Sequence, residues 1–162
     1  MLRLINEFGC IEQRLIVSSS KFSLSGVLQH YGSMVAIKER FNLSKDVIGE
    51  QELFLRYFER LTNISLLREY KLSYIDSTLN KHYRFDGFNE DLRLAVEYDD
   101  ISHFKPIPRF GGVEGLNIRK QRDSFKNEFC VINNIRLIRF NYLTAFTHDI
   151  RLKIEDIVHT LQ

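Results

Sequence analysis

Apolar residues recur along the chain at two spacings, and each spacing predicts one kind of secondary structure. Spacing of three and four residues predicts helices over residues 25–30, 33–41, 49–63, 117–129 and 147–161. Shorter runs rich in aromatic and branched side chains predict strands over residues 66–75, 83–88, 92–99 and 135–140. Residues 2–17 fit a helix or a strand, and the serine-rich residues 18–21 predict a loop.

This order of elements predicts an α/β fold with a mixed central sheet of about four or five strands flanked by helices. Strands 83–88 and 92–99 are joined by Asn89-Glu90-Asp91, whose turn-forming residues predict a hairpin. The two short helices predicted over residues 25–30 and 33–41 form a small helical N-terminal segment, in which Ser33 is placed to cap the second helix. We therefore expect a helical segment over residues 1–48 and a core over residues 49–162.

Three acidic residues interrupt the apolar hairpin: Asp86 in its first strand, and Glu97 and Asp99 in its second. Strand alternation places Glu97 and Asp99 on one face, whereas Asp86 joins them only in one hairpin register, which the sequence leaves open. Buried carboxylates repel one another unless a cation or a proton offsets their charge. The hairpin therefore predicts a site for a divalent cation, Mg²⁺ first. In the alternative interpretation, Asp86 ends a strand and the other two acids face solvent.

Composition limits the class of protein. The chain has 162 residues, of which 44% are hydrophobic, as expected for one globular domain with at most a small appendage. No apolar run is long enough for a membrane span, and the first 20 residues lack the apolar segment of a signal peptide. Cys10 and Cys130 are too few for a zinc site or a disulfide framework. We expect reduced thiols and a cytoplasmic location.

Basic residues gather after the hairpin, although the net charge of the chain is only +2. Residues 105–126 contain two acids, Glu114 and Asp123, and six basic residues, namely Lys105, Arg109, Arg119, Lys120, Arg122 and Lys126. Such a local excess suits contact with nucleic-acid phosphates. Residues 105–115 also hold both prolines and three glycines, so we expect a loop without rigid structure. It is either a mobile flap over DNA or a plain surface loop.

Several segments together resemble the core of the PD-(D/E)XK nuclease superfamily, namely Arg84-Phe85-Asp86-Gly87-Phe88, Leu94-Ala95-Val96-Glu97-Tyr98-Asp99 and Ser102-His103-Phe104. The most similar branch is the very-short-patch-repair-like group of phage homing endonucleases, also called the EDxHD group. That group's RDxxKNxxC segment and last core strand are matched by Gly111-Gly112, Arg122-Asp123, Lys126-Asn127-Glu128-Phe129-Cys130 and Asn133-Asn134-Ile135. The resemblance spans roughly residues 50–143. It departs from the superfamily pattern at Phe85, where a proline is usual, and at Asp99, where a lysine is usual.

The resemblance implies a restriction-endonuclease-like fold and a metal-dependent DNA endonuclease of the homing or another site-specific type, encoded by a phage. Mg²⁺, or Mn²⁺ instead, would be held by Asp86 and Glu97 together with a glutamate of the first core helix. That glutamate is Glu52, with Glu50 as the fallback. His103 would act as general base or steady the leaving group, because its ordinary pKa of about 6.5 suits proton transfer at neutral pH.

The resemblance also assigns roles beyond the metal site. Asp123 would orient His103 or a metal-bound water, Lys126 would meet the scissile phosphate, and Asp99 is an alternative partner for the imidazole. In the other interpretation, Asp123 only forms helix-surface ion pairs with Arg119 and Lys126. The residues expected to contact DNA are Ser33 and Lys38 in a possible helix-turn-helix, and Lys105, Arg109, Arg119, Lys120, Arg122 and Asn127. The helical pair that holds the first two could instead simply pack on the core.

Two other functions remain open on the sequence. A DNA-binding or assembly module could keep the nuclease fold without cleaving DNA, and the missing motif lysine favours it. A structure-specific nickase acting on mismatches or junctions would keep the same active site. Double-strand cleavage usually needs two active sites, so a homodimer is a further expectation that the sequence does not decide.

Overall fold

The computed structural model describes residues 23–43, 48–145 and 150–160. The chain divides into two compact units. The helical unit comprises Met1–Asn63 and Phe146–Gln162, and the sheet unit comprises Ile64–Ala145. This division differs from the expected boundary after residue 48, because α5 (Glu50–Thr62) groups with the N-terminal residues and with α7 (Ile150–His159).

The helical unit begins with two short helices, α3 (Leu24–Tyr31) and α4 (Met34–Arg40), which contact each other. The hydroxyl of Ser33 accepts a hydrogen bond from the backbone N–H of Ala36 at 3.1 Å, so its predicted role as the cap of the second helix is confirmed. Gly32 ends α3 with a φ of +87°, a conformation that favours glycine. Both predicted helices are confirmed to within two residues at each end.

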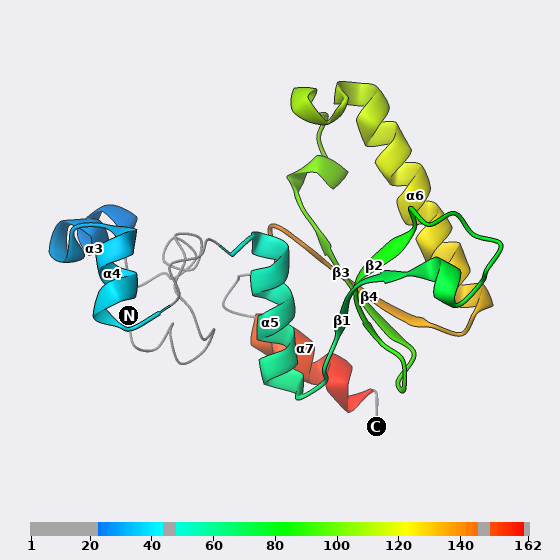
Figure 1. Ribbon diagram of the computed structural model, residues 1–162, viewed down its shortest axis with the longest axis horizontal. Helices are drawn as coiled ribbons and strands as arrows, with labels where there is room; N and C mark the ends of the chain where they lie inside the picture. The colour runs from blue at the N-terminus through cyan, green and yellow to red at the C-terminus, as the bar shows by residue number, and fades with distance from the viewer. Residues whose placement is uncertain (1–22, 44–47, 146–149, 161–162) are drawn as a thin grey trace. The chain divides into compact units, whose positions relative to one another are not determined.

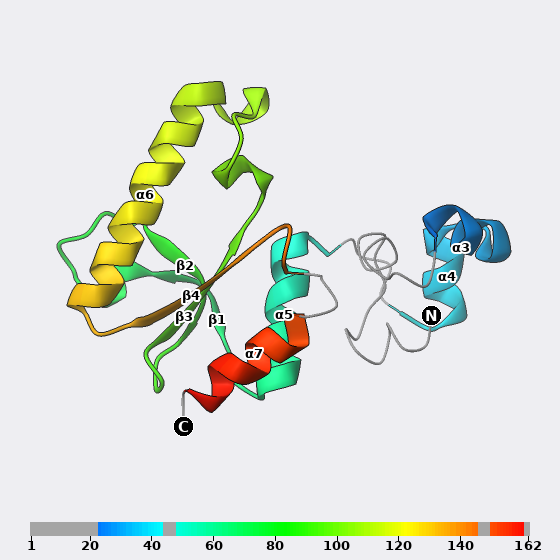
Figure 2. The ribbon, with the colours of Figure 1, turned by 180° about the vertical axis from the view of Figure 1, so that it is seen from behind.

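The helix predicted over residues 49–63 is confirmed as α5, which buries Leu53, Phe54, Leu55, Tyr57 and Phe58. The closing helix predicted over residues 147–161 is confirmed as α7 within the described residues. The two helices contact each other, as both views show (Figures 1 and 2). The predictions for residues 2–17 and 18–21, and those that concern Cys10 and His148, lie outside the described residues.

The sheet unit contains four strands in the order β1-β2-β3-β4. These are β1 (Leu67–Lys71), β2 (Arg84–Asn89), β3 (Leu94–Asp99) and β4 (Arg136–Asn141). The first three pair antiparallel, whereas β4 lies parallel to β3. A parallel pair needs a long crossover, and α6 (Gly112–Ile132) supplies it. The predicted α/β class with a mixed sheet is confirmed.

The core of the sheet unit lies between α6 and the sheet. Phe129 and Cys130 of α6 are buried in one cluster with Tyr70, Phe85 and Phe88 of the strands. The inner strand β3 is buried at all six positions, including its two acids. Burial of apolar area is the main stabilising contribution in such a core. This core therefore packs α6, the helix that contains Asp123 and Lys126, against the β2–β3 hairpin.

Two predicted strands were too long. The strand predicted over residues 66–75 ends at Lys71, because the chain turns into a 3-10 helix over Leu72–Tyr74 in which the N–H groups of Ile75 and Asp76 both donate to the Leu72 carbonyl. The strand predicted over residues 92–99 begins at Leu94, because the turn before it continues to Arg93, whose φ is +46°. In both cases branched or aromatic residues of a turn extended the strand pattern.

The expectation of a loop without rigid structure over residues 105–115 was wrong. Pro108–Phe110 forms a 3-10 turn, Ile107 pairs with Gly112, and α6 already begins at Gly112. A Cβ atom at Gly115 would lie 1.9 Å from the carbonyl oxygen of Phe110, so glycine is required there by close packing of the turn on the helix. Gly112 and Gly115 therefore belong to an ordered turn that leads into α6.

Among the described residues, no helix has the length and apolar character that crossing a membrane requires.

Candidate functional site

The site begins where the backbone pairing of the β2–β3 hairpin stops. Gly87 pairs with Val96, and beyond this pair the two strands are joined through acidic side chains. The N–H of Asp86 donates to Oε1 of Glu97 at 3.2 Å, and the N–H of Tyr98 donates to Oδ2 of Asp86 at 2.8 Å. Asp86 therefore lies beside Glu97, which answers the register question that the sequence left open.

Charged residues continue this row onto the outer strands. On β4, Arg139 pairs in register with Glu97. On β1, the pairs Arg68 with Gly87 and Tyr70 with Phe85 bracket Glu69, which consequently lies across from Asp86. Glu69 has a φ of +51°, and it is the residue of β1 that the pairing with β2 skips. One row across the sheet thus contains three acids and an arginine.

Lys126 of α6 binds the buried acid of this row. Its Nζ atom lies 2.9 Å from Oε1 and 2.7 Å from Oε2 of Glu97, whose exposed fraction is only 2%. Burial and the neighbouring charge of Glu97 raise the pKa of Asp86 to about 7. Burial also raises the pKa of Glu97, although Lys126 opposes this shift. The buried Glu97 and the half-buried Asp86 therefore share Lys126 as their neighbouring cation, and a further cation would lower the pKa of both acids.

A second charged group lies at the end of β3 and contains Asp99, His103, Asp123 and Arg139. The Nδ1 atom of His103 lies 2.9 Å from Oδ2 of Asp123 and 3.6 Å from Oδ1 of Asp99. Arg139 donates from Nη2 to Oδ1 of Asp123 at 2.9 Å and from Nε to Oδ2 of Asp99 at 3.0 Å. The surface-pair interpretation of Asp123 is wrong, because its partners are His103 and Arg139 rather than residues of its own helix.

The two ionisable groups at the centre of this cluster shift in opposite directions. The hydrogen bond to Asp123 raises the pKa of His103, even though burial opposes it. Burial would raise the pKa of Asp123, but the hydrogen bonds from His103 and Arg139 outweigh it and hold that pKa below its usual value. The ion pair is therefore favoured between an imidazolium and a carboxylate.

The distances among Asp99, His103 and Asp123 would by themselves allow a metal ion, since one ligand atom of each lies within 4.8 Å of the others. The guanidinium of Arg139, however, already binds both carboxylates. A second cation at this point would be repelled by the first. The acids Asp86 and Glu97 form the better candidate for a cation site, because burial raises both of their pKa values and Lys126 is the cation that binds this pair among the described residues.

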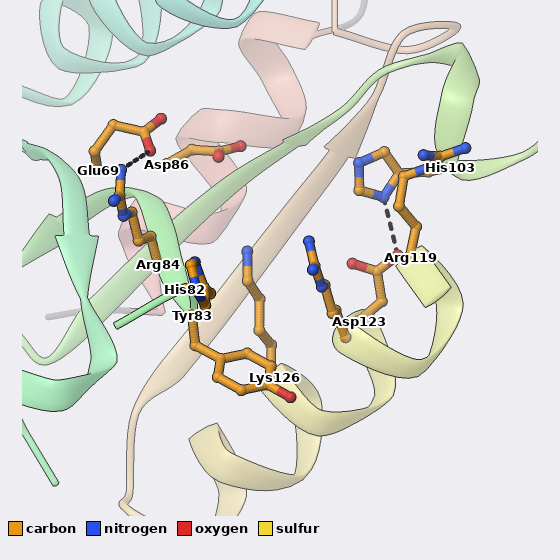
Figure 3. A pocket seen from close by; sticks show the side chains of 10 residues that line it. Glu69, His82, Tyr83, Arg84, Asp86, His103, Arg119, Asp123 and Lys126 are labelled. Atoms are coloured by element: carbon orange, nitrogen blue, oxygen red, sulfur yellow. Dashed lines mark hydrogen bonds and ion pairs between the residues drawn. The ribbon is translucent and has the colours of Figure 1, made fainter. Parts of the chain in front are cut away.

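Asp86 and Lys126 of the first group and His103 and Asp123 of the second line one pocket of about 340 Å³ (Figure 3). Asp86 and His103 lie on different sides of it, with Lys126 between them in this view. The strands and α6 both contribute acids and cations, and the rings come from the segment before β2 and from the turn after β3. The lining residues are Glu69, His82, Tyr83, Arg84, Asp86, His103, Arg119, Arg122, Asp123 and Lys126. Acidic, basic and imidazole groups therefore converge on one cavity.

The other basic residues predicted to contact DNA are distributed around this pocket or outside it. Arg119 and Arg122 line it, and Arg119 also donates to the carbonyl oxygens of Ser102 at 2.9 Å and Phe110 at 3.2 Å. The guanidinium of Arg109 lies 4.5 Å from the centre of the Phe110 ring. The predicted residues with exposed side chains are Lys105, Arg109, Lys120, Arg122 and Asn127. The structure thus places two of the predicted cations in the pocket itself.

Predicted site residues of the helical unit have other local partners. Glu52 accepts a hydrogen bond from Nε of Arg56 at 2.7 Å on the surface of α5, and Glu50 lies in the first turn of that helix. The Ser33 hydroxyl caps α4, and Lys38 has an exposed fraction of only 5%. Ser33 and Lys38 were predicted to contact DNA. In the structure the Ser33 hydroxyl is engaged as a helix cap and the Lys38 side chain is buried.

The site residues missed in the sequence include Arg139 and Glu69, beside His82, Tyr83 and Arg84 of the pocket lining. Arg139 occupies a strand, β4, whose alternate residues Ile138 and Phe140 are buried. A charged residue within such a strand is the signal that could have found it. Glu69 had been noticed only as part of a strand, and nothing local distinguishes it from any exposed strand glutamate. Its position opposite Asp86 depends on the pairing of β1 with β2.

Comparison with known proteins adds little to this description. No protein-family model matches the sequence, and no solved structure matches it. The chain is similar to Uncharacterized protein 307L of Invertebrate iridescent virus 6, with 34% identity over 64 residues. The match covers 39% of this chain and 32% of the viral protein, so the chain spans about a third of that relative's length.

Proposed function

We propose that this protein is a metal-dependent endonuclease that hydrolyses phosphodiester bonds in DNA, of the homing or another site-specific type. The observation that carries the proposal is one pocket lined by Asp86, Lys126 and the imidazole of His103, in which Lys126 also binds the buried Glu97 that lies beside Asp86. Phosphodiester hydrolysis needs cations for the phosphate, an activated water and a proton acceptor. These three requirements correspond to the groups in the pocket.

The acid pair suits a hard divalent cation. Asp86 uses Oδ2 for the N–H of Tyr98, and burial together with the charge of Glu97 raises its pKa, so a cation beside it would favour the carboxylate form. Carboxylate oxygens are the ligands that Mg²⁺ and Mn²⁺ prefer. Asp86 and Glu97 would hold the ion, with Glu69 from β1, which lies across from Asp86, as a third carboxylate. A bound Mg²⁺ would supply positive charge for a phosphate oxygen and a water of lowered pKa.

His103 is oriented for proton transfer. A carboxylate only accepts hydrogen bonds, so the proton between His103 and Asp123 resides on Nδ1. In the neutral imidazole the lone pair then lies on Nε2. Within the part of the chain that the structure describes, Nε2 makes no hydrogen bond, and the ring lines the pocket. His103 can therefore take a proton from a water that enters the pocket, and Asp123 stabilises the imidazolium that forms.

The cations of the pocket would bind the phosphate. Lys126 provides an ammonium next to the acid pair, and Arg119 and Arg122 provide guanidinium groups from the same helix. Lys126 also supplies from α6 the positive charge that the motif lysine would supply from β3, where this chain has Asp99. Fixed cations stabilise the charge that develops on phosphate during hydrolysis without reorganising.

The experiment that tests this proposal is incubation of the purified protein with supercoiled plasmid and Mg²⁺ or Mn²⁺, beside an EDTA control. We expect metal-dependent nicking or linearisation that is lost in Asp86→Asn. Asp76→Asn is a matched control, because Asp76 is an exposed acid of the same unit whose carboxylate bonds only to Thr78 within the described chain. Binding of an oligonucleotide duplex by both variants should equal that of the wild type.

Two results would contradict the proposal. An Asp86→Asn protein that cuts at the wild-type rate would remove the acid pair from the chemistry. A wild-type protein that binds DNA in a salt-dependent manner but leaves plasmid, mismatched duplexes and branched junctions intact with either metal would instead indicate a non-catalytic DNA-binding module. Cleavage restricted to the mismatched or branched substrates would identify a structure-specific nickase.

A further inference from the structure

Arg139 makes the densest set of ionic contacts in the pocket region. Its Nε atom donates to Oδ2 of Asp99 at 3.0 Å, and its Nη2 atom donates both to Oδ1 of Asp99 and to Oδ1 of Asp123. The side chain is only 20% exposed, and its Nη1 atom is buried without a hydrogen-bond partner among the described residues. A buried donor without a partner is costly, so the position of this guanidinium is set by the two acids rather than by its own hydrogen-bonding capacity.

Both of these acids act on the same nitrogen of His103. Asp123 lies 2.9 Å from Nδ1 and Asp99 lies 3.6 Å from it. Two carboxylates this close repel each other, so without a cation between them they would move apart. The charge of Asp100 also raises the pKa of His103. The side chain of Asp100 is itself held in place, because it accepts a hydrogen bond from the N–H of Ser102. The guanidinium of Arg139, which donates to both carboxylates, offsets this repulsion between Asp99 and Asp123.

We propose that Arg139 is a positioning residue whose guanidinium fork fixes Asp99 and Asp123, so that Asp123 receives the Nδ1–H of His103 and Nε2 stays directed at the pocket. Its consequence for catalysis rests on the proposed function of His103. The orientation itself does not, because it concerns only contacts within the folded protein. Partners that orient a functional histidine in metal sites are commonly worth about 10- to 100-fold in activity.

The proposal depends on geometry more than on charge. Arg139 contacts Asp99 through two nitrogens and reaches Asp123 with one of them, which a planar fork allows. A lysine would retain the positive charge but offers a single nitrogen. Replacement of Arg139 by lysine therefore separates the two effects.

The test uses the full chain with Arg139→Lys and Arg139→Gln, and with Arg136→Gln as a control on an exposed residue of the same strand. Proton NMR follows the Nδ1–H resonance of His103, which a hydrogen bond to carboxylate protects from exchange with water and which a His103→Gln spectrum identifies. We expect this resonance in the wild type and in Arg136→Gln, and its loss in both Arg139 variants. In DNA cleavage, kcat should fall about 10- to 100-fold in Arg139→Lys with little change in KM.

Retention of the Nδ1–H resonance and of wild-type kcat in Arg139→Lys would overturn the proposal, because charge alone would then suffice. Absence of the resonance from the wild-type protein would overturn it as well. If the wild type does not cleave DNA, the proposed function fails, but the resonance still decides the role of Arg139. If circular dichroism shows that both Arg139 variants are unfolded, the wild type provides the test. Its Arg139 Nε–H resonance should then shift with the titration of His103, and an unshifted resonance would contradict the proposal.

Discussion

Two pairs of acidic side chains lie at the pocket, each with one member in its lining, and they differ in how their charge is balanced. Asp86 and Glu97 share the single cation Lys126, and burial together with the charge of Glu97 raises the pKa of Asp86 to about 7. Asp99 and Asp123 share Arg139 and the imidazole of His103, and the pKa of Asp123 lies below its usual value because the hydrogen bonds of those two partners outweigh burial.

The difference assigns distinct chemistry to identical functional groups. An acid pair with spare negative charge attracts a further cation, whereas an acid pair that is already neutralised can hold a proton donor in a fixed orientation. Environments that separate the pKa values of neighbouring acids are how one fold assigns different catalytic roles to them. The predictions below test whether the two pairs really behave differently.

The largest expected effect is on proton transfer. In His103→Ala, we expect kcat for DNA cleavage to fall about 10²- to 10⁴-fold with the fold intact, since general bases contribute on this scale. His82→Ala is the matched control, because His82 lines the same pocket but lies outside the pair of Asp99 and Asp123. Steady-state cleavage assays measure both variants. Unchanged turnover in His103→Ala would mean that the imidazole is structural and that the neutralised pair has no catalytic role.

The next effect concerns the cation of the other pair. In Lys126→Met, Glu97 remains buried without its counter-ion, so we expect the free energy of unfolding at pH 8 to fall by about 3 kcal/mol. The loss should shrink in acid, because protonation of Glu97 removes its uncompensated charge. Urea unfolding at pH 8 and pH 5 provides the measurement, with the exposed Lys120→Met as control. Equal losses at both pH values would contradict the description of Glu97 as a buried carboxylate.

A smaller effect follows from the raised pKa of Asp86. In the metal-free folded protein this acid keeps its proton up to about pH 7, whereas the unfolded chain loses it near the ordinary value of 3.8. Stability should therefore fall as pH rises from about 4 to about 7. Asp86→Asn should remove this fall and exceed the wild type at pH 8 by on the order of 2 kcal/mol, while equalling it at pH 4.

Thermal or urea unfolding in EDTA checks this pH dependence. Asp76→Asn is a control of opposite sign, because hydrogen bonds from Thr78 lower the pKa of Asp76. Its carboxylate contributes stability that is present above the unfolded-state pKa and is lost as pH falls through the lower folded-state pKa. A stability curve for Asp86→Asn that runs parallel to that of the wild type would show that Asp86 carries no excess charge.

The smallest effect distinguishes two candidates for a third metal carboxylate. The sequence resemblance assigns Glu52, whereas Glu69 lines the pocket across from Asp86. Loss of one nearby charge is worth about 1 kcal/mol in a water-exposed site, or roughly fivefold in affinity. We expect Glu69→Gln to raise the Mg²⁺ concentration for half-maximal cleavage by this factor and Glu52→Gln to leave it unchanged. The opposite result would assign the role to Glu52.

Local pattern predicted most of the secondary structure and the acids of the hairpin. The helix ends near Ser33 and Gly49 and the turn after Asn89 were readable because caps and turns depend on a few consecutive residues. The errors arose where a local signal has two meanings. Gly115 acts not as a helix breaker but as the residue on which the Phe110 carbonyl packs, and that contact cannot be seen in the sequence.

The sequence by itself determined that acids interrupt an apolar hairpin and that a histidine and a basic helix follow it. Only the tertiary structure decided which charges meet. Lys126 is 29 residues from Glu97 in the chain, and Arg139 is 40 residues from Asp99. The hairpin register brings Asp86 beside Glu97, and the crossover through α6 brings β4 beside β3. The physical reason is that the pKa of a carboxylate depends on burial and on charges within a few ångströms, and these follow from packing rather than from neighbours in the chain.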